Sequence, residues 1–275
     1  MNASGDLVAG QQAVPPTVYL DHWALRIFSQ DQGWASPLTA ALRSRDGTLV
    51  LSWANLAEFS TLTDQRQACQ AETLIEAILP RIFLLEANPF IVIDREDQLL
   101  AGGPPVAPHG DPDFLRALVM LKPRPPALFT AHDLFSVMQS QEAAERTAKM
   151  ADVFVSQLAK MRDEVQTDPT LRATLRRPAT TAPIQRGTRF ILRELVRALM
   201  LDKGTKITRN DALDFFHVVV PVAYCEFVLV DGYWETQVDR VRSRVQESKF
   251  PVPMATVFSR RKEGLDRFIR ELEQG

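Results

Sequence analysis

The hydrophobic pattern alternates between short apolar runs and longer segments in which apolar residues recur every three or four positions. The short runs are rich in β-branched and aromatic residues and predict buried strands at residues 17–20, 48–51, 90–93, 224–230 and 255–258. The periodic segments predict helices at residues 23–28, 53–62, 64–85, 142–165, 185–201, 236–247 and 264–272. This alternation predicts an α/β fold, with helices packed on the faces of a mostly parallel sheet.

The composition changes at Gly102, where a proline-dense stretch begins. Seven of the 18 prolines lie between Pro104 and Pro126, a density that resists regular structure and marks a boundary. A helical block follows, and a second break at residues 178–183 precedes its last helix. The sequence therefore predicts three parts: a loose leader at 1–16, a core made of 17–101 and 202–275, and a helical insertion at 102–201 with a proline-rich entry.

Five acidic residues stand where a parallel sheet would gather them. Asp21 and Asp231 each end a predicted strand, and the carboxyl ends of parallel strands share one edge. Glu58 lies on the helix after the second strand, whereas Asp211 and Asp214 lie one turn apart on one helical face. Two carboxylates about 5 Å apart repel by about 3 kcal/mol at an effective dielectric constant of about 20, so such a cluster needs protons or a cation. Oxygen ligands favour Mg²⁺ or Mn²⁺, which predicts metal-assisted hydrolysis of a phosphodiester.

Each of these positions also has a structural explanation. Asp231 and Gly232 between apolar runs are a hairpin signal, so residues 228–234 could form a hairpin. Asp211 could simply cap a helix. His22 and His217 adjoin the predicted acids and could contact a substrate, but a lone histidine more often has a structural role. The sequence leaves these alternatives open.

The net charge of −2 hides an uneven distribution. Residues 1–171 carry a net charge of −8, residues 172–209 carry +8, and residues 210–275 carry −2. The basic segment places four arginines on one helical stripe: Arg186, Arg189, Arg193 and Arg197. Like charges at this spacing cost about 0.2–0.5 kcal/mol per pair, and a phosphate backbone would neutralise them. The alternative is a solvated face, or pairing with acids of the first segment.

Other patterns exclude several classes of protein. Cys69 and Cys225 are the only cysteines, so neither a disulfide framework nor a zinc site is expected. There is no glycine-rich phosphate loop, dinucleotide fingerprint or nucleophile elbow. The amino terminus lacks a signal-peptide pattern, and no apolar run approaches the roughly 20 residues that cross a bilayer. We therefore expect a cytoplasmic protein without a membrane partner.

The order of the motifs resembles that of the PIN-domain nucleases. The resemblance rests on VYLDHW, SWANLAEFSTL, NDALDFFH, YCEFVLVDGYW and ATVFS before a last helix, and it covers roughly residues 17–95 and 205–275. It implies a PIN-like three-layer α/β fold. In that family, acids after the first and fourth strands and on two helices bind divalent metal and cleave RNA. The matching positions are Asp21, Glu58, Asp211 and Asp231, with Asp214 a close alternative to Asp211.

The resemblance implies an endoribonuclease that depends on Mg²⁺ or Mn²⁺, with RNA favoured over DNA. The charge pattern adds the arginine stripe as the part that guides the substrate backbone. Two departures stand out, because Val230 replaces the Ser or Thr that often precedes the last Asp, and the insertion is unusually large. Glu226 stands where the family often has Asp. The alternative is a non-catalytic module that binds nucleic acid or a partner protein through the insertion. Kinship also leaves open a toxin-like role, an inhibitory protein partner and a homo-oligomer.

Overall fold

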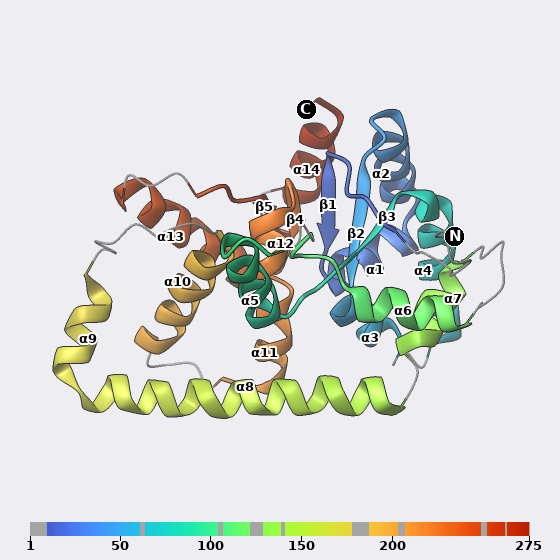
Figure 1. Ribbon diagram of the computed structural model, residues 1–275. Helices are drawn as coiled ribbons and strands as arrows, with labels where there is room; N and C mark the ends of the chain where they lie inside the picture. The colour runs from blue at the N-terminus through green and yellow to red at the C-terminus, as the bar shows by residue number, and fades with distance from the viewer. Residues whose placement is uncertain are drawn as a thin grey trace.

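The protein is represented by a computed structural model of the 275-residue chain (Figure 1). The structure describes residues 10–60, 64–103, 107–121, 129–138, 141–177, 187–202, 207–248, 252–261 and 263–274. Arg186, one of the predicted substrate-binding arginines, lies outside these ranges, as does much of the predicted proline-rich entry.

Five parallel strands form the central sheet. They are β1 (Thr17–Leu20), β2 (Thr48–Ser52), β3 (Ile82–Leu85), β4 (Phe227–Leu229) and β5 (Thr256–Phe258). Their order is β3-β2-β1-β4-β5, and every neighbouring pair is parallel. All residues of β1 and β2 are buried, as expected for strands with helices over both faces. The predicted α/β class with a parallel sheet is therefore confirmed.

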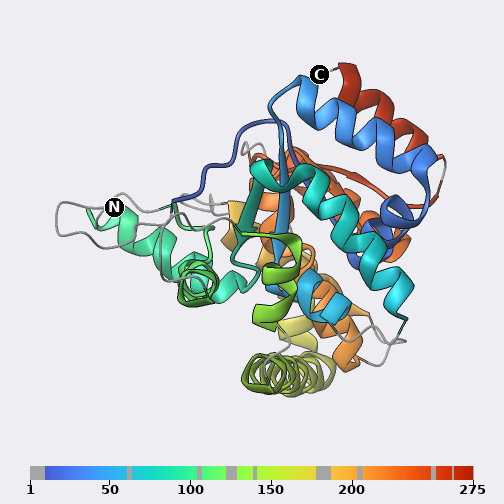
Figure 2. The same ribbon diagram turned by 90° about the vertical axis from the view of Figure 1, so that its right-hand side faces the viewer.

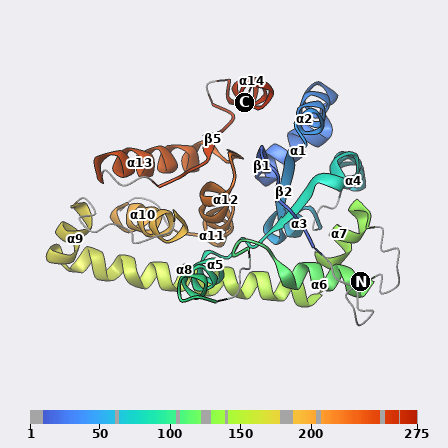
Figure 3. The same ribbon diagram turned by 45° about the horizontal axis from the view of Figure 1, so that its top comes forward.

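Helices cover both faces of this sheet. They are α1 (His22–Gln30), α2 (Gln32–Ser44), α3 (Trp53–Ser60), α4 (Gln65–Ile78), α5 (Pro89–Leu100), α6 (Pro112–Leu121), α7 (Ala131–Met138), α8 (Gln141–Thr167), α9 (Pro169–Arg176), α10 (Gly187–Leu201), α11 (Arg209–Phe216), α12 (Val219–Tyr224), α13 (Gly232–Ser248) and α14 (Gly264–Gln274). The long helix α8 runs along the bottom of Figure 1 and is seen nearly end-on in Figure 2. Helix α14 lies beside α2 (Figure 3).

The alternation of side chains along the strands divides the core into two hydrophobic clusters. Tyr19 and Val50 belong to one cluster, together with buried residues of α5, α8 and α10 to α13. Val18 and Leu49, one position away in the same strands, belong to the other cluster, with α1, α2, α4, α7 and α14. Because successive strand residues point to opposite faces, the sheet is the middle layer of three.

Two predicted elements have the opposite secondary structure in the protein: the predicted strand is helical, and the end of the predicted helix is a strand. Residues 90–93, predicted as a strand, lie in α5, because Asn88 caps its amino end and Pro89 takes its first position. The third strand is instead Ile82–Leu85, which was predicted as the end of a long helix. Helix α4 stops at Ile78, and a 3₁₀ turn that contains Pro80 leads into the strand.

The last strands also differ in part from the prediction. The run at 224–230 was predicted to be one strand, but β4 spans only Phe227–Leu229, because Val219–Tyr224 forms α12. The hairpin alternative at residues 228–234 is wrong, since Gly232 begins α13 and β4 pairs in parallel with β5.

The segment predicted as an insertion shares its core with the sheet. Phe154 of α8 and Phe190 of α10 belong to the same hydrophobic cluster as Tyr19 of β1. Helix α10 packs on α5, α12 and α13 as well as on α8. The described part of the predicted leader is also held in place, because the Gln11 side chain exchanges hydrogen bonds of 2.8 and 2.7 Å with the Leu84 backbone.

Candidate functional site

The strand order changes direction between β1 and β4, which makes this position the switch point of the sheet. From β1 the chain adds β2 and β3 on one side, and it later returns to add β4 and β5 on the other side. In open α/β sheets, ligands bind outside the carboxyl ends of the strands at such a switch point. Asp21 directly follows β1, and its backbone N–H donates to the Leu229 carbonyl of β4 at 2.9 Å. Asp231 lies two residues beyond β4, so both predicted strand-end acids stand at the switch point.

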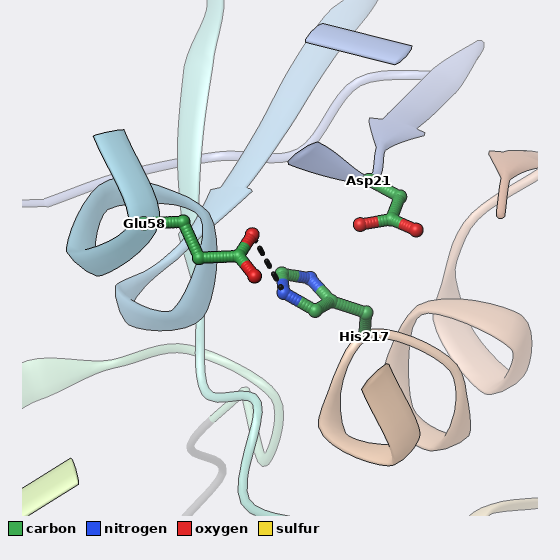
Figure 4. Close-up of side chains that lie close together, drawn as sticks. All are labelled: Asp21, Glu58 and His217. Atoms are coloured by element: carbon green, nitrogen blue, oxygen red, sulfur yellow. Dashed lines mark ion pairs between the residues drawn. The ribbon is translucent and has the colours of Figure 1, made fainter. Parts of the chain in front are cut away.

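Three side chains from separate elements point toward one another at this end of β1 (Figure 4). Asp21 after β1, Glu58 of α3 and His217 at the end of α11 offer ligand atoms that all lie within 4.8 Å of one another. Asp21 and His217 are buried, whereas the Glu58 side chain is 28% exposed. The Nε2 atom of His217 lies 3.5 Å from Oε2 of Glu58. Among the described residues, this is the one group of three such side chains close enough to share a metal ion.

The two acids of α11 have different surroundings. Asp211 completes a capping box with Thr208, because its carboxylate accepts hydrogen bonds from the Thr208 N–H and hydroxyl, both at 2.6 Å. Asp214 is half-buried, and its burial and the charges of Asp21, Asp231 and Glu58 raise its pKa to about 7. The structure therefore brings Asp214, rather than Asp211, into the electrostatic field of the predicted site.

Asp231 both caps a helix and acts electrostatically on the other acids. Its Oδ1 atom accepts hydrogen bonds from the backbone N–H groups of Tyr233 at 2.7 Å and Trp234 at 3.0 Å, which caps the start of α13. Its charge also raises the pKa of Asp21 and Asp214. Asp231 is thus fixed by the helix that it caps while it faces the other acids.

The pKa values in the cluster show how its charges are balanced. Burial raises the pKa of Asp21, and the charge of Glu58 adds to this effect, whereas His217 opposes it. Burial would also raise the pKa of Glu58, but the close imidazole of His217 and its charge lower it overall. Burial would lower the pKa of His217, yet Asp21, Glu58 and Asp214 raise it to about 9. At neutral pH, His217 is therefore an imidazolium surrounded by carboxylates.

A buried hydrogen-bond chain holds this imidazolium in place. The Nδ1 atom of His217 lies 2.6 Å from the Tyr19 hydroxyl, which lies 2.9 Å from the Ser52 hydroxyl. Ser52 donates to Asn55 at 3.1 Å, and Asn55 donates to the Leu20 carbonyl at 2.8 Å. A charged ring donates from both nitrogens, so Nδ1–H points to Tyr19 and Nε2–H points to Glu58. Sequence reasoning missed this chain and left open whether His217 contacts a substrate or has a structural role.

These pKa values predict that the metal-free fold becomes less stable as the pH rises. The folded protein holds the His217 proton more tightly than the unfolded chain does, because the pKa is about 9 rather than 6.5. Its contribution is complete below 6.5 and is lost between 6.5 and 9. The raised pKa of Asp214 acts in the same direction between 3.8 and about 7, because the folded state retains the proton there.

Urea unfolding in the presence of a chelator should show this trend. We expect the free energy of unfolding to fall by on the order of 3 kcal/mol over the titration range of His217. His217→Gln, which cannot titrate, should flatten the upper part of the profile and leave the lower part sloping. Identical profiles for the two proteins would contradict the assignment of the charge to His217.

The described arginines of the predicted stripe are all paired with acids. Arg189 forms an ion pair with Asp97 of α5. Arg197 donates to Glu194 at 2.8 Å, and Arg193 lies 3.7 Å from the same carboxylate. Glu194 is buried and also accepts a hydrogen bond from Arg244 of α13. Of these three arginines, only Arg189 pairs with an acid of the first segment, whereas Arg193 and Arg197 pair with Glu194 of their own helix, and the Arg197 side chain is only 15% exposed.

Comparisons of the chain with models of protein families, with curated proteins and with solved structures find no match. In the part of the chain that the structure describes, no helix combines the length and apolar character needed to cross a membrane. The fold and the site therefore define the protein only by class. It is a three-layer α/β protein with a five-stranded parallel sheet and a buried acid–histidine cluster at the switch point of that sheet.

Proposed function

We propose that this protein is a nuclease that depends on Mg²⁺ or Mn²⁺ and hydrolyses phosphodiester bonds, with RNA favoured over DNA. The observation that carries the proposal is the charge of the cluster. Four carboxylates, those of Asp21, Glu58, Asp214 and Asp231, act on one another or on the His217 cation, and burial together with the neighbouring acids raises the pKa of Asp214 to about 7. A divalent cation would supply the missing positive charge.

The donor set fits such an ion. Asp21 and Glu58 offer carboxylate oxygens that lie within 4.8 Å of each other, and Asp214 and Asp231 add negative charge to their surroundings. Hard oxygen ligands suit Mg²⁺ and Mn²⁺, and the charged His217 ring is a neighbour of the carboxylates rather than a ligand. A bound divalent ion supplies a water of lowered pKa and neutralises charge on the phosphate.

The residues of the chain then have separate roles. Asp21 and Glu58 would hold the ion, and His217, whose Nε2 lies 3.5 Å from Oε2 of Glu58, would orient the Glu58 carboxylate. Asp214, with a pKa of about 7, accepts the proton of the attacking water near neutral pH. Asp231, whose Oδ1 is fixed by the start of α13, would add negative charge to the group that holds the ion.

The direct test is incubation of the purified protein with end-labelled single-stranded RNA and DNA, with Mn²⁺, with Mg²⁺ or with a chelator. We expect endonucleolytic cleavage of RNA only when the divalent metal is present, and slower cleavage of DNA. An Asp231→Asn preparation purified in parallel controls for contaminating nucleases. Cleavage that persists in the chelator, or no cleavage with either metal, would contradict the proposal.

The ion pair between His217 and Glu58 supports a second candidate function. An imidazolium already provides one positive charge inside the cluster, so the acids could be purely structural in a non-catalytic module that binds nucleic acid or a partner protein. Mn²⁺ titration with thermal unfolding separates the two candidates. A rise in melting temperature with Mn²⁺ concentration supports the nuclease, and an unchanged melting temperature supports the module. A cytoplasmic location, an inhibitory partner and a homo-oligomer remain predictions.

A further inference from the structure

Two exposed arginines stand at the carboxyl end of β5, beside the strand that leads to Asp231. Arg260 and Arg261 follow Ser259, the residue after β5. The two strands end side by side, because the Val230 N–H donates to the Phe258 carbonyl at 3.0 Å. Within the described ranges, neither guanidinium forms an ion pair, in contrast to the arginines of α10.

Arg260 is positioned by an aromatic ring next to Asp21. Its guanidinium carbon lies 4.8 Å from the centre of the Trp23 ring, and Trp23 is two residues after Asp21 at the start of α1. A cation held over an aromatic face loses little conformational freedom on binding a ligand. The N–H groups at the edge of the guanidinium are the ones that bind phosphate oxygens. Trp23 therefore orients Arg260 at the start of α1, the helix that Asp21 caps.

Arg261 is positioned by the backbone next to Asp231. Its Nη1 atom donates to the Gly232 carbonyl at 3.0 Å. A Cβ atom on Gly232 would lie 2.3 Å from Nε of Arg261, so the absence of a side chain lets the arginine lie against this turn. The Arg261 N–H donates to Ser259 at 3.1 Å, and the buried Ser259 hydroxyl donates to Glu235 at 2.6 Å. The connection after β5 is therefore anchored to α13.

We infer that Arg260 and Arg261 form a phosphate-binding rim that holds the backbone of single-stranded RNA against the acidic cluster. This inference rests on the proposed nuclease function. An uncompensated group of carboxylates repels a polyanion, so the substrate needs fixed cations near the acids. Arg260 and Arg261 meet this need, since each contacts a residue within two positions of Asp21 or Asp231. The arginines of α10 are already committed to acids.

Binding of a short fluorescein-labelled single-stranded RNA in chelator, followed by anisotropy at several salt concentrations, tests the rim. The double variant Arg260→Ala, Arg261→Ala should bind about tenfold more weakly, and its salt dependence should fall by about 0.7 per lost phosphate contact. In cleavage assays with Mn²⁺, we expect KM to rise more than kcat falls. Arg260→Lys keeps the charge but loses the planar group over Trp23, so it should fall between the wild type and Arg260→Ala.

Two further double variants serve as comparisons. Arg43→Ala with Arg81→Ala removes the same charge at the opposite edge of the sheet, near the amino ends of β2 and β3, and should leave the affinity unchanged. Arg189→Ala with Arg193→Ala tests the α10 stripe directly. If the Arg260/Arg261 double variant binds RNA normally and the wild-type protein cleaves RNA, the proposed phosphate-binding rim is overturned and the nuclease proposal is left intact. Failure of the wild type to cleave RNA with Mn²⁺ overturns the nuclease proposal instead.

Discussion

Asp231→Asn is expected to lose metal-dependent RNA cleavage by about a thousandfold or more while keeping its fold. The amide removes one negative charge from the group that would hold the cation. The side-chain oxygen that accepts hydrogen bonds from Tyr233 and Trp234 is retained in asparagine, which is an equally good helix cap. Initial rates with Mn²⁺, together with the melting temperature, measure both effects in one preparation.

The matched control for this variant is Asp239→Asn on the same helix. Asp239 is exposed and pairs with Arg242 one turn further along α13, far from any role in the cluster. It loses the same charge by the same chemical change, so it should cleave RNA at the wild-type rate. Undiminished cleavage by Asp231→Asn would count decisively against the metal site. Loss of activity with a large fall in melting temperature would instead show that the cap, and not the charge, was removed.

The sheet shows where the sequence pattern is informative and where it is not. Residues 90–93 and 82–85 are both short apolar runs, and periodicity alone cannot distinguish a buried strand from a segment of a buried helix. The helix-start signal of Asn88 followed by Pro89 would have settled the first case. The run at 17–20 was predicted correctly, because its neighbours on both sides interrupt the apolar pattern.

The site was predictable wherever an acid follows a strand. Asp21 and Asp231 could be placed at one edge because the carboxyl ends of parallel strands coincide. Asp211 and Asp214 could not be separated by helical spacing, since both lie on one face. The sequence does contain a capping signal, Thr208 three residues before Asp211, that explains the outcome.

The histidine of the cluster had a weaker signal in the sequence. His217 follows Asp214 by three residues, a spacing at which helical side chains meet, but the same spacing occurs in many structural pairs. Its burial and its hydrogen bond to Tyr19 depend on how α11 packs against β1 and β2. The chain from Tyr19 through Ser52 to Asn55 joins two strands and a helix, and it is therefore set by tertiary packing.

His217→Ala should destabilise the metal-free protein by about 3–5 kcal/mol, the usual cost of breaking a buried ion pair from one side. The substitution removes the buried cation that balances Asp21, Glu58 and Asp214. It also removes one of the two hydrogen-bond partners of the buried Tyr19 hydroxyl, which keeps Ser52. If the cluster accepts a divalent cation, Mn²⁺ should restore much of the loss, since a ligand at 100 times its Kd stabilises by about 2.7 kcal/mol. Urea unfolding with chelator and with Mn²⁺ measures both quantities.

The pattern of the two measurements decides between the candidate functions. His132→Ala on α7 is the control, because its ion pair with Glu72 lies at the surface and should contribute little. Destabilisation that Mn²⁺ reverses shows that a metal ion and an imidazolium can serve as alternative counter-charges for the same carboxylates. Destabilisation that Mn²⁺ leaves unchanged shows that the acids bind only the histidine, as in a non-catalytic module. An unchanged stability in chelator would mean that His217 is not the charge that holds this cluster together.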